Sequence, residues 1–256
     1  MKITKELLKE KGACAAGYRD FLKEYPVDKY PDGVEYQELL DCCAEKDFSY
    51  GSWLLGAFGK TDEVRKIDGD LIVEKGIIFA GRLEVKGCIK AGGGIEAGWG
   101  IEAGWGIKAG GGIKAGGGIE AGWGIEAGGG IKAGDGIKAG CSIKAGDGIK
   151  AGCSIRAGFG IETGYGIEAG GGIEAGWGIE AGGGIRAGFG IEAGWGIKAG
   201  GGIKAGWIIR AGDEFGIYAG LRFRVTNKTQ RKIIAKNRPE NIMCGEFEEK
   251  KDDAVR

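Results

Sequence analysis

A six-residue repeat fills the middle of this 256-residue chain and limits what the chain can fold into. From Ile89 to Gly212 the letters recur, with few exceptions, as Ile, then Lys, Glu or Arg, then Ala, Gly, a variable residue and Gly. A single unit cannot bury its one isoleucine, so the copies must stack on one another and share a core. The repeat therefore predicts a solenoid.

The repeat also accounts for the 58 glycines, a content that collagen or a flexible linker could share. Collagen needs Gly at every third residue and abundant proline, whereas this chain has three prolines and a period of six. A flexible linker has no reason to keep an aliphatic residue in strict phase. Both alternatives are excluded by the repeat.

Each unit reads as one side of a coil. Ile, a charged residue and Ala point in, out and in, which is typical of a three-residue strand. We expect the following Gly, variable residue and Gly to form a corner, because glycine reaches backbone angles that a tight turn requires. The fold class is thus mainly β, a single-stranded parallel β-solenoid.

Two coil sizes fit units of six. Three units per turn give a triangular coil with a period of eighteen, and two units give a flattened coil with a period of twelve. Aromatic residues at the variable place coincide more often at the longer period, which favours the triangular coil, although the duplicated segment GIKAGDGIKAGCS fits the shorter one. A triangular coil predicts about nine turns and a rod of about 40 Å.

Flanking segments differ from the repeat. Residues 1–66 carry the helical signals and predict a small α-helical N-terminal cap, with Trp53 inside it. The solenoid is expected over residues 67–224, because the phase begins before the repeat. Residues 225–256 are expected to form a C-terminal cap and a charged tail.

The six-residue phase runs past the repeat at both ends. It is present from Leu71 onward, and Phe215 and Leu221 continue it, with Ile217 and Phe223 at the following inward place. Large residues replace Ala at that second inward place near both ends. We expect them to plug a narrow core.

The variable residue must point outward, because a close-packed interior would not accept Gly, Asp, Cys and Trp at equivalent places. Stacking three units per turn then lines up large side chains along one corner, with Cys141 among them. Monomers seldom expose such a row unless a partner covers it. We call this row the aromatic ridge and predict that it binds a partner; it consists of Trp105, Trp123, Phe159, Trp177 and Trp195.

Five consecutive units carry a basic residue at the outward place, and four glutamate units follow them. This basic belt either keeps the surface solvated or meets a complementary surface on a partner or on a second copy. Asp135 and Asp147 lie within it and make nucleic-acid binding the weaker alternative. The basic belt is the second predicted partner-binding feature and consists of Lys132, Lys138, Lys144, Lys150 and Arg156.

The stretch IDGDLIVEKGIIFAGRLEVKGCIKAGG, with alternating aliphatic residues and glycine corners, resembles the core of bactofilins, bacterial proteins built as triangular β-helices. The resemblance implies a right-handed coil and end-to-end polymerisation into a scaffold. It covers about a tenth of the chain.

The sequence gives little support for catalysis or for a bound cofactor. The chain has no histidine, which removes Ser-His and Cys-His nucleophile pairs and His-ligated zinc. Its seven cysteines lack metal-ligand spacing and suit reduced thiols. The chain has 36 basic residues (Lys and Arg) and 36 acidic residues (Asp and Glu), so it carries no net charge that would attract nucleic acid. We expect no enzyme, cofactor, metal or small-molecule substrate.

The function expected from these patterns is protein binding by a rigid, non-catalytic solenoid. The partner is another protein, such as a toxin or a component of a defence system, or a second copy in a structural scaffold. The start of the chain is charged and lacks the apolar core of a signal peptide, and no apolar stretch is long enough to cross a membrane. A cytoplasmic protein is therefore expected.

Overall fold

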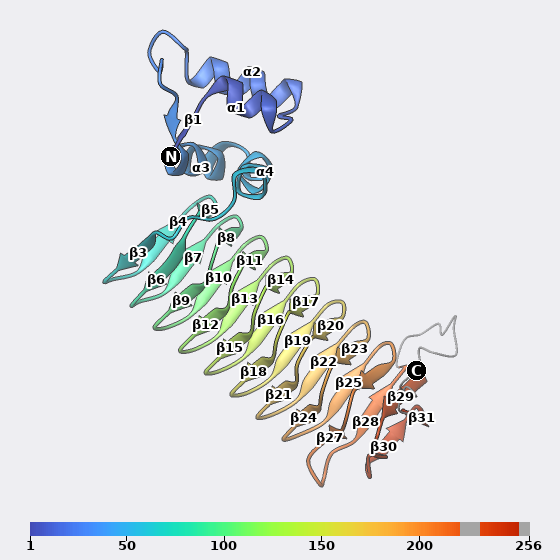
Figure 1. Cartoon of the computed structure of the whole chain (residues 1–256). Helices are drawn as coiled ribbons and strands as arrows, with labels where there is room; N and C mark the ends of the chain where they lie inside the picture. The colour runs from blue at the N-terminus through green and yellow to red at the C-terminus, as the bar shows by residue number, and fades with distance from the viewer. Residues whose placement is uncertain (221–230, 251–256) are drawn as a thin grey trace.

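The fold is a long parallel β-solenoid with four helices at its N-terminal end, seen in a computed structural model that describes residues 1–220 and 231–250 (Figure 1). Three sheets run along the coil, and each turn contributes one strand to each sheet except at the C-terminal end, where the described residues add strands to only two of the sheets. Along the array each isoleucine pairs with the isoleucine three units further on, as Ile107 does with Ile125. This register confirms the triangular coil, and the alternative of two units per turn is wrong.

The three sides of the coil are called sheets I, II and III. Sheet I holds β4 (Leu71–Val73), β7 (Ile89–Ala91), β10 (Ile107–Ala109), β13 (Ile125–Ala127), β16 (Ile143–Ala145), β19 (Ile161–Thr163), β22 (Ile179–Ala181), β25 (Ile197–Ala199), β28 (Ile217–Ala219) and β30 (Ile242–Cys244). Sheet II holds β5 (Ile77–Phe79), β8 (Ile95–Ala97), β11 (Ile113–Ala115), β14 (Ile131–Ala133), β17 (Ile149–Ala151), β20 (Ile167–Ala169), β23 (Ile185–Ala187), β26 (Ile203–Ala205), β29 (Lys232–Ala235) and β31 (Glu246–Glu249). Sheet III holds β3 (Val64–Ile67), β6 (Arg82–Val85), β9 (Ile101–Ala103), β12 (Ile119–Ala121), β15 (Ile137–Ala139), β18 (Ile155–Ala157), β21 (Ile173–Ala175), β24 (Ile191–Ala193) and β27 (Ile209–Arg210).

The core is a column of isoleucine and alanine. In the parallel ladders each residue pairs with the same residue type of the next turn, so Ile107 lies beside Ile125 and Ala109 beside Ala127. The repeat isoleucines and alanines are buried, while nearly all the charged residues between them are exposed. Phe79 and Val85 are buried at the Ala place near the N-terminal end, where larger plugs were expected.

The glycines of the repeat serve close packing rather than unusual backbone angles. Among the described residues, positive φ occurs only at five glycines outside the array, so the expected reason for glycine at the corners is wrong. A Cβ on Gly116 would lie 2.1 Å from the carbonyl oxygen of Gly98 one turn earlier. A Cβ on Gly118 would be 3.4 Å from its nearest neighbour. The first corner glycine is thus sterically required, and the second can be replaced, as it is by Ser142 and Ser154.

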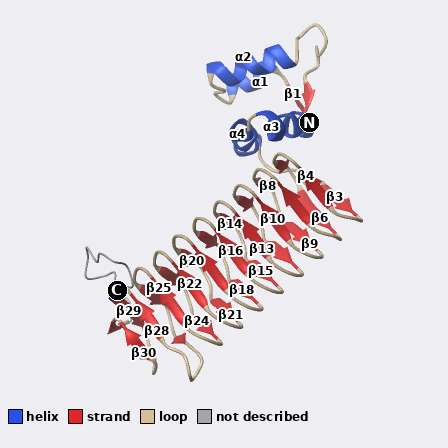
Figure 2. Cartoon of the chain, turned by 180° about the vertical axis from the view of Figure 1, so that it is seen from behind, coloured by secondary structure: helices blue, strands red, loops and turns tan. Residues whose placement is uncertain are grey.

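Four helices precede the coil (Figure 2): α1 (Lys5–Glu10), α2 (Ala15–Glu24), α3 (Tyr36–Lys46) and α4 (Phe48–Phe58). A short antiparallel pair, β1 (Lys2–Ile3) and β2 (Val34–Glu35), ties the segment before α1 to the segment before α3. The helical core includes Ile78 of β5, whose outward side chain is only 1% exposed. Trp53 is 37% exposed, so its expected place inside the helical segment is wrong.

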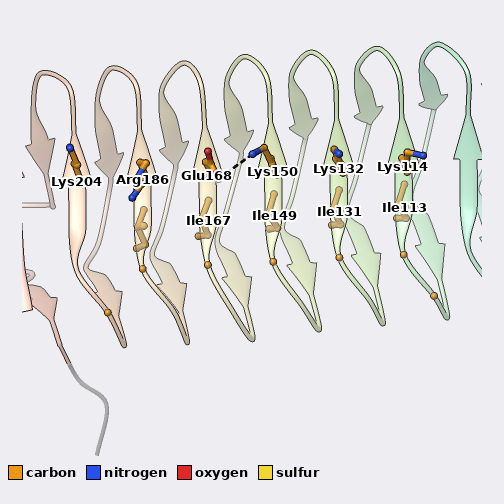
Figure 3. Close-up of a pocket in the computed structure, with 18 of the residues that line it drawn as sticks. Ile113, Lys114, Ile131, Lys132, Ile149, Lys150, Ile167, Glu168, Arg186 and Lys204 are labelled. Carbon is orange, nitrogen blue, oxygen red and sulfur yellow. Dashed lines mark ion pairs between the residues drawn. The ribbon is translucent and has the colours of Figure 1, made fainter. Parts of the chain in front are cut away.

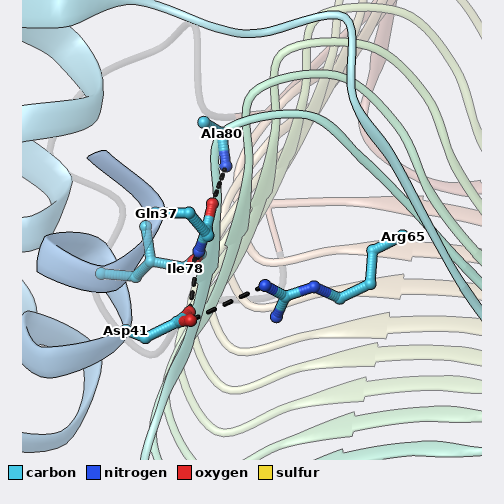
Figure 4. Close-up of polar contacts among 5 residues, drawn as sticks. All are labelled: Gln37, Asp41, Arg65, Ile78 and Ala80. Atoms are coloured by element: carbon cyan, nitrogen blue, oxygen red, sulfur yellow. Dashed lines mark hydrogen bonds and ion pairs between the residues drawn. The ribbon is translucent and has the colours of Figure 1, made fainter. Parts of the chain in front are cut away.

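Helix α3 also covers the free edge of sheet II (Figure 4). The Ile77 N–H and the Phe79 carbonyl form hydrogen bonds with the next turn of the coil. The backbone N–H and carbonyl groups of the alternate residues 76, 78 and 80 therefore point the other way, toward the N-terminal edge of the sheet. The Gln37 side chain pairs with this edge as a strand would: its amide nitrogen donates to the Ile78 carbonyl (2.8 Å), and its amide oxygen accepts from the Ala80 N–H (3.1 Å). An edge strand left bare would invite pairing with another chain.

The C-terminal end departs from the expected phase. Ile217, not Phe215, lies next to Ile197 in sheet I, because the chain carries two extra residues before β28. Phe215 is exposed, so its predicted inward place is wrong. Strands β29, β30 and β31 continue the ladders of sheets I and II, which extends them to ten strands within the described residues. The predicted inward places of Leu221 and Phe223 lie outside those residues.

Candidate functional site

The aromatic ridge lies at the corner between sheet III and sheet I. Each of its five residues lies two positions before the isoleucine that begins a sheet I strand, as Trp123 does before Ile125 of β13. The backbone stays in register along this corner, with the Trp123 N–H donating to the Trp105 carbonyl (3.1 Å) and the Trp195 N–H to the Trp177 carbonyl (3.1 Å). The side chains project outward, and Trp123 is 58% exposed and Trp195 46%.

The rings of the ridge stack face to face along the rod. Trp177 and Trp195 have ring centroids 4.8 Å apart and planes within 3° of each other, and Trp105 and Trp123 are 5.2 Å and 22° apart. Phe159 adjoins Trp177 at 4.7 Å with a tilt of 46°. Because Phe159 and Trp195 cover the two faces of Trp177, that ring presents mainly its edges to solvent.

Cys141 divides the ridge into two stacks. Its backbone keeps the ladder, since its N–H donates to the Trp123 carbonyl (3.0 Å) and its carbonyl accepts from the Phe159 N–H (3.1 Å). Its small side chain leaves a gap between the rings of Trp123 and Phe159. One stack therefore has two rings, and the other begins at Phe159.

Phe215 extends the second stack and was missed by the sequence analysis as a ridge residue. Its ring lies 5.4 Å from that of Trp195, with planes 12° apart. The segment FGIYAG matches the order of the repeat, with Phe at the variable place. Matching the repeat letters, rather than counting in sixes, would have found it.

The basic belt does not form one patch. Its members alternate around the coil, with Lys132 and Lys150 on sheet II, Lys138 and Arg156 on sheet III, and Lys144 on sheet I. Four of the five lie beside a glutamate of a neighbouring turn: Lys138 beside Glu120 (2.6 Å), Lys144 beside Glu162 (3.1 Å), Lys150 beside Glu168 (3.3 Å) and Arg156 beside Glu174 (3.3 Å). Most of its charge is therefore compensated locally.

A shallow trough of about 1280 Å³ runs along the outer face of sheet II, from α4 to β29. Figure 3 shows the part of it between Lys114 and Lys204. The variable place at the corner between sheets I and II is glycine from β7 to β26 except at Asp147 and Tyr165, so most of this side of the face lacks large side chains. The row of outward residues is mainly basic and includes three that the sequence analysis did not single out, Lys114, Arg186 and Lys204. Glu168 interrupts the row beside Lys150.

The helical segment encloses a second concavity, a cleft of about 670 Å³ lined by residues of all four helices. Cys43 lies in it, and burial raises the pKa of its thiol to about 12, which keeps the sulfur protonated and a poor nucleophile. Burial also raises the pKa of Tyr36, with a further contribution from the nearby charge of Glu96. Both groups are therefore protonated at neutral pH.

Glu96 is the one buried carboxylate among the described residues, at 3% exposure. It lies on β8 under α4, where Ser52 donates a hydrogen bond to one carboxylate oxygen and Lys114 forms an ion pair with the other. A buried carboxylate with both oxygens bonded is typical of a structural contact. It attaches α4 to the second turn of sheet II.

No group of three or more Cys, Asp or Glu side chains that could hold a metal ion occurs in residues 1–220 and 231–250. The helices of the same part of the chain are all too short or too polar to cross a membrane. All seven cysteines are free thiols.

Comparison with protein-family models, with curated proteins and with solved structures gives no match for this chain. The functional interpretation therefore depends on the geometry of the molecule alone.

Proposed function

We propose that this protein is a non-catalytic binding module, a rigid β-solenoid that docks on a partner protein through the aromatic ridge. The observation that carries the proposal is the exposed stack from Phe159 through Trp177 and Trp195. An ordered, exposed row of large rings is costly to keep in water unless another surface covers it. Tryptophan is also among the residue types most enriched at positions that dominate binding energy in protein interfaces.

The orientation of the rings favours a protein over a nucleic acid. Bases stack on open aromatic faces, but in this ridge the faces of Trp177 are covered by Phe159 and Trp195. The exposed ring edges suit apolar contacts with side chains, and the indole N–H groups can donate hydrogen bonds to backbone carbonyls. The locally paired basic belt gives the nucleic-acid alternative less support than its sequence suggested.

The charged faces beside the ridge set the orientation of the partner in this proposal. Paired charges at the edge of an interface influence association rate and specificity more than affinity. A repeat that expands by copying units suits a binder whose surface must change quickly, such as a toxin-immunity protein or an inhibitor of a defence system. Seven free thiols are compatible with the reducing cytoplasm, where we place this activity.

Capture from lysate of the source cell tests the ridge. We expect tagged wild-type protein to retain a specific partner and a variant with Trp105, Trp123, Trp177 and Trp195 changed to serine to lose it. The matched control changes Tyr165 and Phe189, which are exposed on the other two corners, to serine. Circular dichroism should show an intact fold in both variants. Equal capture by all three proteins would refute the proposal.

A self-assembling scaffold of the kind implied by the bactofilin resemblance is a second candidate. Its support is the N-terminal edge of sheet I, where Ile72 of β4 is 65% exposed, whereas the edge that Gln37 of α3 covers belongs to sheet II. Exposed apolar edge strands favour pairing with another chain. Light scattering across concentration should then reveal polymers that Ile72→Lys abolishes, and particles of constant small mass would count against the scaffold.

A further inference from the structure

The outer face of sheet I carries a charge sequence that is complementary to itself when reversed. Its outward residues from β7 to β22 are Lys90, Lys108, Glu126, Lys144, Glu162 and Glu180. All six are exposed, and within one chain Lys108 lies beside Glu126 (3.0 Å) and Lys144 beside Glu162 (3.1 Å), so a facing copy would extend these pairs into clusters of alternating charge. If a second copy lies antiparallel on this face, with a two-fold axis midway between β13 and β16, every one of the six meets the opposite charge.

The position of the axis decides whether the charges match. The axis between β13 and β16 sets Glu126 against Lys144, Lys108 against Glu162 and Lys90 against Glu180, each pair occurring twice. Moving the axis one turn toward the N-terminus sets Lys90 against Lys144, and moving it one turn toward the C-terminus sets Glu126 against Glu180. An axis through a strand sets that strand's outward charge against itself. Like charges placed directly opposite are destabilising, so the register is specified.

The sizes of the residues along the ridge corner are also complementary between two copies related by the same two-fold axis. A two-fold axis that lies between the two faces and perpendicular to the rods keeps both ridges on the same side of the dimer. Trp123 of one copy then faces Cys141 of the other, where the stack has its gap. Farther out, Gly87 faces Trp177 and Gly69 faces Trp195.

The remaining ridge pair joins Trp105 of one copy to Phe159 of the other. Two aromatic rings side by side across an interface add attraction beyond the buried area. Small residues thus oppose large ones at three positions, and two rings meet at the fourth. The axis chosen from charge alone therefore also avoids steric conflict along the ridge.

We propose that the partner of this ridge is a second copy of the chain, and that sheet I and the aromatic ridge form an antiparallel two-fold homodimer. The inference rests on the proposed function and names the bound protein. Six turns of a face roughly 18 Å wide bury about 500 Å² per copy before the ridges are counted, which places the dimer at the small end of specific interfaces. The dimer should therefore dissociate on dilution.

Sedimentation equilibrium and charge exchange test the dimer. We expect the wild-type chain to form dimers whose dissociation constant rises at least about tenfold in Lys108→Glu and in Glu162→Lys, since each variant places like charges opposite each other twice. Lys204→Glu, which makes the same charge change on sheet II, is the matched control and should dimerise as the wild type does.

Mixing the two sheet I variants is the decisive measurement. In a mixed dimer, the carboxylate introduced by Lys108→Glu in one chain would face the ammonium group introduced by Glu162→Lys in the other, and the second pair would keep its original charges. Dimers should reappear on mixing. A monomeric wild type, a dimer indifferent to both variants, or variants that stay monomeric when mixed would each overturn the inference. A monomeric wild type would leave ridge binding to a different protein to be decided by the capture experiment.

Discussion

Phe215 stacks on Trp195 with ring centroids 5.4 Å apart, although two more positions separate them along the chain than separate Trp177 from Trp195. Each ring lies two positions before the isoleucine of its strand, Ile217 and Ile197, and those isoleucines pair in sheet I. The two extra residues are therefore absorbed in the loop between β27 and β28. The register of the core, rather than the residue count, places the ring.

Deleting Asp213 and Glu214 together restores a six-residue unit and should leave β28 in place. The cost should be about 1 kcal/mol, because Asn241 loses its hydrogen bond to the Asp213 carbonyl. Deleting Glu214 alone leaves one extra residue, which the same loop can absorb while Ile217 stays in the core, and the Asp213 carbonyl remains available to Asn241. Urea denaturation should therefore rank the double deletion as the less stable protein. A single deletion that is much less stable than the double deletion would contradict the account of the register.

Gly116 and Gly118 belong to the same corner but should respond differently to alanine. The Cβ of Gly116→Ala would meet the Gly98 carbonyl oxygen at 2.1 Å, so the turns must move apart, at a cost of about 2 kcal/mol or more. Gly118→Ala meets its nearest atom at 3.4 Å and should change the free energy of unfolding by about 0.5 kcal/mol or less. Chemical denaturation of the two variants measures the difference. Equal effects would show that packing between turns does not explain the glycines.

Removing the Gln37 amide should expose the edge of sheet II. In Gln37→Leu the Ile78 carbonyl and the Ala80 N–H lose their partners, which should cost about 1 to 3 kcal/mol. Hydrogen exchange should accelerate at the Ala80 amide and stay slow at the Gly98 amide, which bonds to the Phe79 carbonyl within the coil. Gln37→Glu keeps the acceptor for Ala80 and should give an intermediate result. Unchanged exchange at Ala80 would contradict the edge-capping role.

The helical segment should lose stability in alkaline solution. Burial raises the pKa of Cys43 from 9.0 to about 12 and also raises the pKa of Tyr36 above its usual 10.0. The unfolded chain therefore releases these protons at lower pH than the folded chain does, so the stabilisation is complete below about pH 9 and declines between pH 9 and 12. Urea denaturation at pH 8 and pH 10.5 measures the loss. Cys43→Ala should reduce this pH dependence, and an unaltered slope would exclude the Cys43 thiol as a source.

The sequence by itself determined the strand, the period and the core. An isoleucine and an alanine two positions apart, repeated in every unit, can be buried only by stacking, and the coincidence of aromatic residues in every third unit indicated three sides. Those inferences depend on the alternation of apolar and charged residues within each unit and on the burial of apolar surface. Both can be read from the order of the residues in the chain.

The tertiary structure determined the features that the six-residue period does not specify. The closeness of Gly116 to the turn before it, the gap at Cys141 between two ring stacks, and the distribution of the basic belt over three faces depend on distances between turns. The Gln37 contact with β5 joins residues 41 positions apart in the chain and follows no periodic pattern. Contacts of this kind arise from packing of whole elements against one another, so only the assembled coil reveals them.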